Sequence, residues 1–290
     1  MNPIPADWVL ATTHLASDYV YHQFCALIRV RPKVLPPAEL NSILFMACFN
    51  LVRMLADAYL NPVVLDKFGV IVLWYLPGAI DPAIQNDMMV ATLMMSGPLG
   101  MSVTRSGADK KWYTHESNFQ SSQQGLTPGC INLSPGWFLQ AHPAPKFHPE
   151  VSATLRVCGS SLCQAMQRPA ALIAAALRVM HPSLYWSSLT TKLGLSLWAD
   201  NNQLEEMGNR LREWVSVFTA LAVMCNRCSP LHHDTLSRAQ WFNVMTSVGN
   251  HSPVRMQMPN IGVEIAYNSG VMVGASGRIV RHGMDKVDGD

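Results

Sequence analysis

The chain has 290 residues, of which 49% are apolar and 14% are charged, and its net charge is +2. This length allows one large domain or two small ones, and the apolar content is sufficient for a substantial core. So mild a charge argues against a histone-like nucleic-acid binder, although it leaves room for a local basic groove.

The N-terminal part carries no predicted targeting or membrane-spanning segment. Residues Met1–Asp7 lack a basic segment followed by an apolar one, so they are not a signal peptide. The longest apolar run, Phe68–Ile80, is too short to span a bilayer and is interrupted by Pro77 and Gly78. We therefore expect an intracellular protein with no membrane partner.

The first part of the chain is predicted to be mainly helical, with some strands. Residues 38–60 have apolar positions at helical spacing, and Asn61-Pro62 ends that helix. Val70–Leu76 is a compact apolar run that is typical of a buried strand. Arg105–Pro149 is rich in turn-forming residues, which predicts a long loop that is either functional or mobile.

Two more helices are predicted before residue 215, where the pattern of apolar and polar residues changes. Pro169–Met180 is alanine-rich, and Pro169 suits the first turn of a helix. The next helix runs from about Asn202 to Trp214, with its acidic residues early and its basic residues late, as the helix dipole favours.

From Val215 onward, short apolar segments alternate with Ser, Gly, Pro and Asn. The segments with β character are 217–223, 241–248, 255–258, 263–267, 271–273 and 279–284. Strands at this close spacing are typical of a sandwich or barrel. The sequence therefore predicts an α+β chain, in which a mainly helical part, residues 1–214 with the loop 105–149, packs on a β-sandwich segment, residues 215–290.

Seven cysteines are spread along the chain, an odd number that favours reduced thiols in an intracellular compartment. Cys225 and Cys228 form a lone Cys-x-x-Cys. Cys158 and Cys163 could add zinc ligands, but their spacing matches no clear second motif. Free thiols are the preferred interpretation over a zinc site.

His232, Asp234 and His282 are the candidate metal ligands. Residues i and i+2 of a strand point to the same face, so His232 and Asp234 can bind one ion together. His282, on a different strand, supplies the third ligand. Two histidines and one carboxylate hold non-haem Fe(II) and leave its other positions open. A lone His-x-Asp recurs by chance, so the surrounding residues must support this interpretation.

Those surroundings resemble the TET/JBP dioxygenases of mushroom-forming fungi. The residues that carry the resemblance are 68–78, 126–136, 225–234, 262–267, 277–283 and 288–290. The resemblance implies a double-stranded β-helix (jelly-roll) core with a helical N-terminal part that is integral to the catalytic domain. It also implies an Fe(II)- and 2-oxoglutarate-dependent enzyme that oxidises methyl groups on DNA bases, chiefly 5-methylcytosine and in some members also N6-methyladenine.

The resemblance transfers roles to individual residues. His232, Asp234 and His282 match the iron ligands. Arg227 matches a basic residue that pairs with a carboxylate of 2-oxoglutarate, which a guanidinium suits. Ser237 falls where relatives place an Asn or Asp that contacts the base. Methylated DNA is the implied partner and the nucleus the implied location, and no protein partner is implied.

The resemblance also implies an arginine and a last strand after Gly289-Asp290, where this sequence stops. Arg278, on the face of His282 if their strand is regular, is the substitute we consider for binding 2-oxoglutarate. These differences predict weak turnover of 2-oxoglutarate. They also keep an alternative open: a truncated, catalytically weak or dead relative that acts as a DNA- or protein-binding module.

A polar loop upstream mixes cations and aromatic residues. Lys110, Lys111 and Trp112 suit phosphate contact and base stacking. An ordinary solvated loop explains them equally well. His233, between two ligands, is expected to be structural, and His142 and His148 are expected to be solvated.

Overall fold

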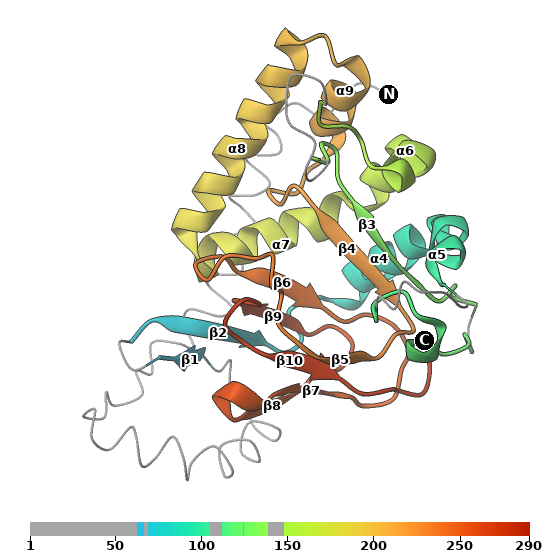
Figure 1. Ribbon diagram of the computed structural model, residues 1–290, viewed down its shortest axis with the longest axis vertical. Coiled ribbons are helices and arrows are strands. Elements are labelled where there is room, and N and C mark those ends of the chain that lie inside the picture. Colours follow the sequence, from blue (N-terminus) through green and yellow to red (C-terminus); the bar gives the residue numbers. More distant parts are fainter. Residues whose placement is uncertain (1–62, 67–68, 105–111, 124, 139–147) are drawn as a thin grey trace. The chain divides into compact units, whose positions relative to one another are not determined.

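The computed structural model describes residues 63–66, 69–104, 112–123, 125–138 and 148–290. These residues fall into two compact units (Figure 1). The first contains the described residues between 86 and 227, and the second contains those between 63 and 85 and from 228 to 290. The predicted helix over 38–60 lies outside the described residues.

The first unit is mainly helical and has one two-stranded sheet. Its elements are α4 (Pro82–Met94, whose first turn belongs to the second unit), α5 (Ser96–Ser102), the 3-10 turn η2 (Glu116–Asn118), β3 (Gly129–Leu133), α6 (Ala153–Ala165), α7 (Gln167–Met180), α8 (Pro182–Asn201), α9 (Glu205–Glu213) and β4 (Leu221–Cys225). Strands β3 and β4 pair antiparallel. Their buried residues join those of α6 and α9 in one core, which includes Leu133, Leu155 and Leu211.

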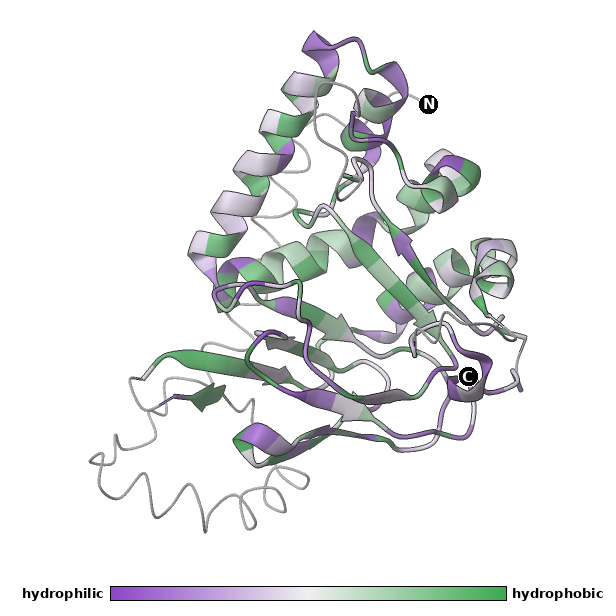
Figure 2. Ribbon diagram, viewed as in Figure 1, coloured by the Kyte–Doolittle hydropathy of each residue, from purple (hydrophilic) through white to green (hydrophobic). Residues whose placement is uncertain are grey.

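Local sequence explains the position of two helices of this unit, α7 and α8. Helix α7 is mostly apolar (Figure 2), and its alanines are largely buried. Helix α8 begins at Pro182, where the Leu184 N–H donates to His181 Nδ1. The predicted helices over 169–180 and 202–214 are confirmed as α7 and α9.

Several elements of the first unit were not predicted, among them α4, α5, α6, α8 and β3. Helix α8 has 20 residues, but its Leu, Ser and Thr residues give no one-sided apolar stripe. Strand β3 lies inside the stretch 105–149 that the sequence predicts to be irregular. Its five residues stand between a Thr-Pro-Gly and a Ser-Pro-Gly turn, so the turn signals mask a short strand.

The second unit is an antiparallel β structure with two four-stranded sheets. Its elements are β1 (Val63–Leu65), β2 (Ile71–Leu76), β5 (Ser229–His232), β6 (Asn243–Thr246), β7 (Arg255–Met258), the 3-10 turn η3 (Pro259–Ile261), β8 (Val263–Ala266), β9 (Met272–Ala275) and β10 (His282–Met284). The strand orders are β1-β2-β9-β6 and β5-β10-β7-β8, and every pair is antiparallel.

Both sheets contribute to one core. Leu73 and Val273 come from the first sheet, and Met258 and Ile265 come from the second; all four are at most 2% exposed. Alternating buried positions along β7 and β8 give each strand one face toward this core. The strand predicted over 70–76 and the short strands predicted after residue 240 are confirmed within a few residues. Strands β1 and β2 complete a sheet of this unit from an earlier part of the chain.

Within the described ranges, no helix has the length and apolar character that crossing a membrane requires.

Candidate metal centre

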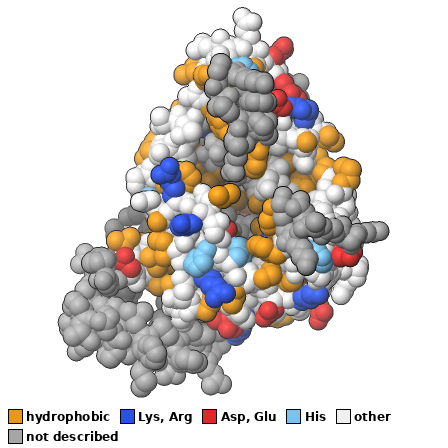
Figure 3. Space-filling model, in the orientation of Figure 1, with side chains coloured by type: hydrophobic (Ala, Val, Ile, Leu, Met, Phe, Trp, Pro, Cys, Tyr) orange, Lys and Arg blue, Asp and Glu red, His pale blue; other side chains and the backbone are white. Residues whose placement is uncertain are grey.

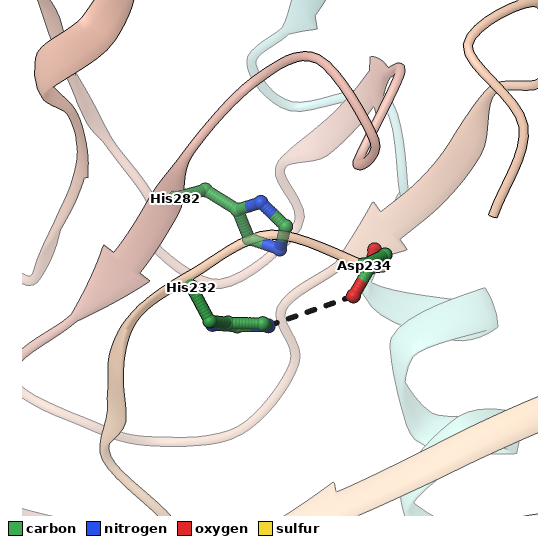
Figure 4. A group of neighbouring side chains, drawn as sticks. All are labelled: His232, Asp234 and His282. Carbon is green, nitrogen blue, oxygen red and sulfur yellow. Dashed lines mark ion pairs between the residues drawn. The ribbon is translucent and has the colours of Figure 1, made fainter. Parts of the chain in front are cut away.

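Three side chains of the second unit converge on one point (Figure 4). One ligand atom from each of His232, Asp234 and His282 lies within 4.8 Å of the other two. His232 Nε2 is 3.6 Å from Asp234 Oδ1, and the two imidazole ring centroids are 4.5 Å apart. His282 is buried, while His232 and Asp234 are partly exposed. A metal here would therefore be held from the protein side and open to solvent on the other.

Strand pairing brings the two histidines together. His232 is the last residue of β5 and His282 is the first of β10, and the two are register partners in the antiparallel pair. Gly283 lets the strands approach. A Cβ there would lie 2.8 Å from Ser229 O and 2.9 Å from Leu231 N. A larger residue would push β10 from β5 and separate the two rings.

The other ring nitrogen of each histidine is already engaged. His232 Nδ1 is 2.8 Å from Pro230 O, and His282 Nδ1 is 3.0 Å from Val280 O. A carbonyl only accepts, so each Nδ1 donates its proton there, and Nε2 is the ring nitrogen left to bind a metal. Metal-binding histidines usually have this arrangement, in which the outer hydrogen bond fixes both ring orientation and tautomer. The donor set present therefore fits a divalent metal such as Fe(II).

Asp234 reaches the site by a route that the sequence did not predict. Strand β5 ends at His232, so the expectation that His232 and Asp234 share a regular strand is wrong. The Asp234 N–H instead donates to Gly277 O at 2.8 Å. Asn243 Nδ2 donates to Asp234 Oδ2, which leaves Oδ1 directed at His232. A contact with the segment around residue 277, and not strand alternation, aims this carboxylate.

Gly277 and Asn243 thus shape the candidate site, and the sequence analysis assigned neither of them a role. A Cβ on Gly277 would lie 2.1 Å from Asp234 Oδ2 and 2.7 Å from Asn243 Nδ2. The carboxylate occupies space that any other residue at 277 would fill. The signal available in the sequence was the glycine itself, five residues before His282; nothing local marked Asn243.

Two other predicted site residues lie in the second unit. Arg278 is exposed in the turn before β10, which starts only at His282, so the expectation that it shares a strand face with His282 is wrong. Its guanidinium Nη1 donates to Thr235 O at 2.5 Å. The N–H of Ser237 donates to Asp234 O at 2.9 Å, which closes a turn directly after the carboxylate ligand.

Arg227 and Trp112 belong to the first unit and contact each other. The Arg227 guanidinium carbon is 4.9 Å from the centroid of the Trp112 ring, and Nη1 donates to Tyr113 O at 3.2 Å. The same Nη1 lies 3.1 Å from Cys130 Sγ. Burial raises the pKa of the Cys130 thiol, and the nearby Arg227 charge partly offsets this. Lys110 and Lys111 lie outside the described residues.

The cysteines form no cluster of metal ligands in the described part of the chain. Cys225, Cys228, Cys158 and Cys163 are reduced, and none of them forms a disulfide. The group His232, Asp234 and His282 contains none of them.

Comparisons with known proteins assign the C-terminal half of the chain to one kind of domain. Residues 147–289 match the model of the TET/JBP family, described as the oxygenase domain of the 2OGFeDO superfamily. A solved structure described as NgTET1 in complex with 5mC DNA is similar over 88% of this chain and 87% of that chain, with a TM-score of 0.50 and 12% identity. No curated protein matches. The likeness to a TET oxygenase confirms the predicted α+β fold with a double-stranded β-helix core. The matched segment, residues 147–289, therefore corresponds to a TET/JBP oxygenase domain, and its superfamily uses Fe(II) and 2-oxoglutarate.

Proposed function

We propose that this protein oxidises the methyl group of 5-methylcytosine in DNA, with Fe(II) as its metal and 2-oxoglutarate as its co-substrate. The observation that carries the proposal is the convergence of His232, Asp234 and His282 inside a TET/JBP oxygenase domain. The similarity to NgTET1, a protein solved with 5mC DNA, supports the choice of substrate. The alternative of a binding module without catalysis is not favoured, because all three candidate ligands are present and close together.

In this proposal His232 and His282 bind Fe(II) through Nε2, and Asp234 binds it through Oδ1. The iron supplies the centre at which 2-oxoglutarate and dioxygen react beside the methyl group. The protein contributes orientation. Pro230 O and Val280 O hold the imidazole rings by their Nδ1–H groups, so the nitrogen lone pairs face the ion before it binds.

The carboxylate ligand has its own support. Asn243 occupies Oδ2 of Asp234, which leaves Oδ1 for the metal and restricts rotation of the carboxylate. Solvent reaches His232 and Asp234 but hardly reaches His282. The open side of the centre is therefore where we place the co-substrate and the DNA base.

The remaining site residues are proposed on weaker grounds. Arg227 and Arg278 are candidates for binding the carboxylates of 2-oxoglutarate, which a guanidinium suits. Ser237, in the turn after Asp234, is a candidate for contact with the base. Lys110, Lys111 and Trp112 are candidates for contact with the DNA strand. A methylated-DNA substrate in turn supports a nuclear location.

The test is conversion of a synthetic duplex that contains one 5-methylcytosine. We expect the iron-loaded protein, with 2-oxoglutarate and air, to yield 5-hydroxymethylcytosine by mass spectrometry, with succinate released in step. Asp234→Ala removes a ligand and should abolish both products. Asp285→Ala removes an exposed carboxylate near His282 and should retain them. A matched duplex with N6-methyladenine tests the second base that the family resemblance implies.

Two results would count against the proposal. One is the absence of oxidised base from the iron-loaded protein with either duplex. The other is full activity of Asp234→Ala, which would show that the reaction does not use this centre.

A further inference from the structure

The loop between β5 and β6, residues 233–242, carries an unusually exposed apolar side chain next to the metal centre. Leu236 is 82% exposed, the highest value among the large apolar side chains of the described residues. It occupies the turn that runs from Asp234 to Ser237. A single exposed leucine is ordinary on a protein surface. Its surroundings therefore decide whether this one has a role.

The loop is fixed to the centre at several points. The N–H of Ser237 donates to Asp234 O at 2.9 Å. Arg278 donates to Thr235 O at 2.5 Å, and the Ser276 hydroxyl donates to Ala239 O at 2.8 Å. Two residues of chain span at most about 7 Å, so Leu236 stays within that reach of the carboxylate ligand. The side chain of Leu236 is exposed, whereas the backbone of its neighbours Thr235 and Ser237 is hydrogen-bonded.

Cationic side chains accompany this apolar one. Arg238 and Arg278 are exposed, and neither forms an ion pair with a carboxylate of the described residues. The Arg238 guanidinium carbon lies 5.7 Å from the centroid of the Trp241 ring, which itself is 48% exposed. On the face drawn in Figure 3, Lys or Arg side chains lie beside histidine side chains. Positive charge next to an apolar projection fits a nucleic-acid duplex, whose phosphates flank an apolar base stack.

A base must leave the duplex before an enzyme can oxidise it, and its departure opens a gap in the stack. Filling that gap with an apolar side chain recovers part of the lost stacking. Such a side chain must be exposed, apolar and held close to the reacting centre. Leu236 meets all three conditions.

We propose that Leu236 is a wedge, which enters the base stack of the DNA duplex in place of the base that turns toward the metal centre. Arg238 contacts a phosphate beside the gap, and Arg278 holds the loop by its bond to Thr235. This inference rests on the proposed function. It goes further in naming duplex DNA as the preferred form of the substrate and in assigning the residue that opens it.

The experiment compares one 5-methylcytosine oligonucleotide as a matched duplex and as a single strand. A single strand has no stack to open, so the wedge should aid only the duplex. We expect Leu236→Ala to lower the ratio of duplex to single-strand activity by about tenfold. Leu236→Met, which keeps the apolar volume, should hold the ratio within about twofold of the unchanged protein. Leu197→Ala is the matched control, since Leu197 is 66% exposed on α8.

A second readout follows opening of the stack without oxidation. A duplex with 2-aminopurine beside the target base should brighten on binding the unchanged protein under anaerobic conditions, and brighten less with Leu236→Ala. Iron content and melting temperature confirm that the variants are folded.

Different outcomes of these experiments test the wedge role of Leu236 and the proposed oxidation of 5-methylcytosine. A tenfold fall of the ratio in Leu236→Ala alone supports the wedge. An unchanged ratio overturns it, and so does an equal loss on both substrates, because the loop would then only support Asp234. If the unchanged protein oxidises the single strand and the duplex equally, the wedge is overturned while the proposed function stands. If it oxidises neither, the proposed function itself fails.

Discussion

Replacement of Gly277 by alanine tests the metal centre through one added carbon atom. The new Cβ would lie 2.1 Å from Asp234 Oδ2 and 2.9 Å from Asp234 Cγ, whereas ordinary contact begins at 3.4 Å. Gly277 does not have a positive φ, so the added atom acts through space and not through backbone strain. The carboxylate, or the chain that carries it, has to move by about 1.3 Å.

Metal sites do not tolerate such a displacement. Ligand distances in a working site vary by only about 0.2 Å. The shift also breaks the bond from Asn243 to Oδ2. Losing the outer support of a ligand typically lowers metal affinity by about 10- to 100-fold, or roughly 1.4 to 2.7 kcal/mol. We expect Gly277→Ala to lose Fe(II) affinity by at least this factor.

Anaerobic calorimetric titration with Fe(II) measures the metal affinity of the variant. Gly194→Ala, in the middle of α8, is the control because a Cβ there meets nothing within 4 Å. It should bind iron normally and can gain slight stability from the better helix propensity of alanine. Circular dichroism and melting curves show whether Gly277→Ala is folded. A folded Gly277→Ala protein with the iron affinity of the unchanged protein would refute the argument that this glycine makes room for Asp234.

Two further predictions concern the first unit. Arg227→Ala should weaken 2-oxoglutarate binding at least tenfold, because a charge-assisted hydrogen bond contributes about 1.5 to 3 kcal/mol. Calorimetry measures this affinity. If the affinity does not change, Arg227 only packs against Trp112. Burial lowers the pKa of Lys192 to about 8 from its usual 10.5. Between pH 8 and pH 10.5 the unfolded chain therefore binds more protons than the folded protein. The free energy of unfolding should rise with pH across that interval. Lys192→Met should flatten this rise and increase the free energy of unfolding at pH 7 by at most about 3 kcal/mol, as measured by urea denaturation. If stability depends on pH in the same way in the variant, Lys192 is solvated.

The sequence predicted elements well where one local pattern dominates. Strand β7 has the predicted bounds, because apolar and polar residues alternate over Arg255–Met258. Helix α7 was predicted from alanines that are buried all along it. Helix α8 was missed because its residues show no single apolar face. It begins at Pro182, where His181 accepts from the Leu184 N–H, and it ends where the Asn202 N–H donates to Trp198 O. Only Tyr185 and Ala199 of that helix are buried, so it lacks the apolar face by which a sequence usually signals a helix.

The three candidate ligands lie close together, as a shared metal would require, whereas their arrangement was only partly predicted. The pairing of β5 with β10 agrees with the expectation that His232 and His282 come from different strands. The position of Asp234 depends on the carbonyl of Gly277 and on the side chain of Asn243. Both residues are distant from Asp234 in sequence, and no periodicity connects them to it. Local spacing can name ligands, but it cannot show which contact aims them.

The three ligands therefore depend on the fold in two different ways. Each histidine is oriented by a carbonyl two residues before it, so its orientation follows from the local backbone of its own segment. Asp234 is oriented by a segment from elsewhere in the chain, and the loop that follows it carries Leu236. A force on that loop, such as insertion into a base stack, would reach the carboxylate before it reached either imidazole. Asp234 is thus the candidate ligand whose side chain is oriented by hydrogen bonds from distant residues, and we expect contact with duplex DNA to disturb it first.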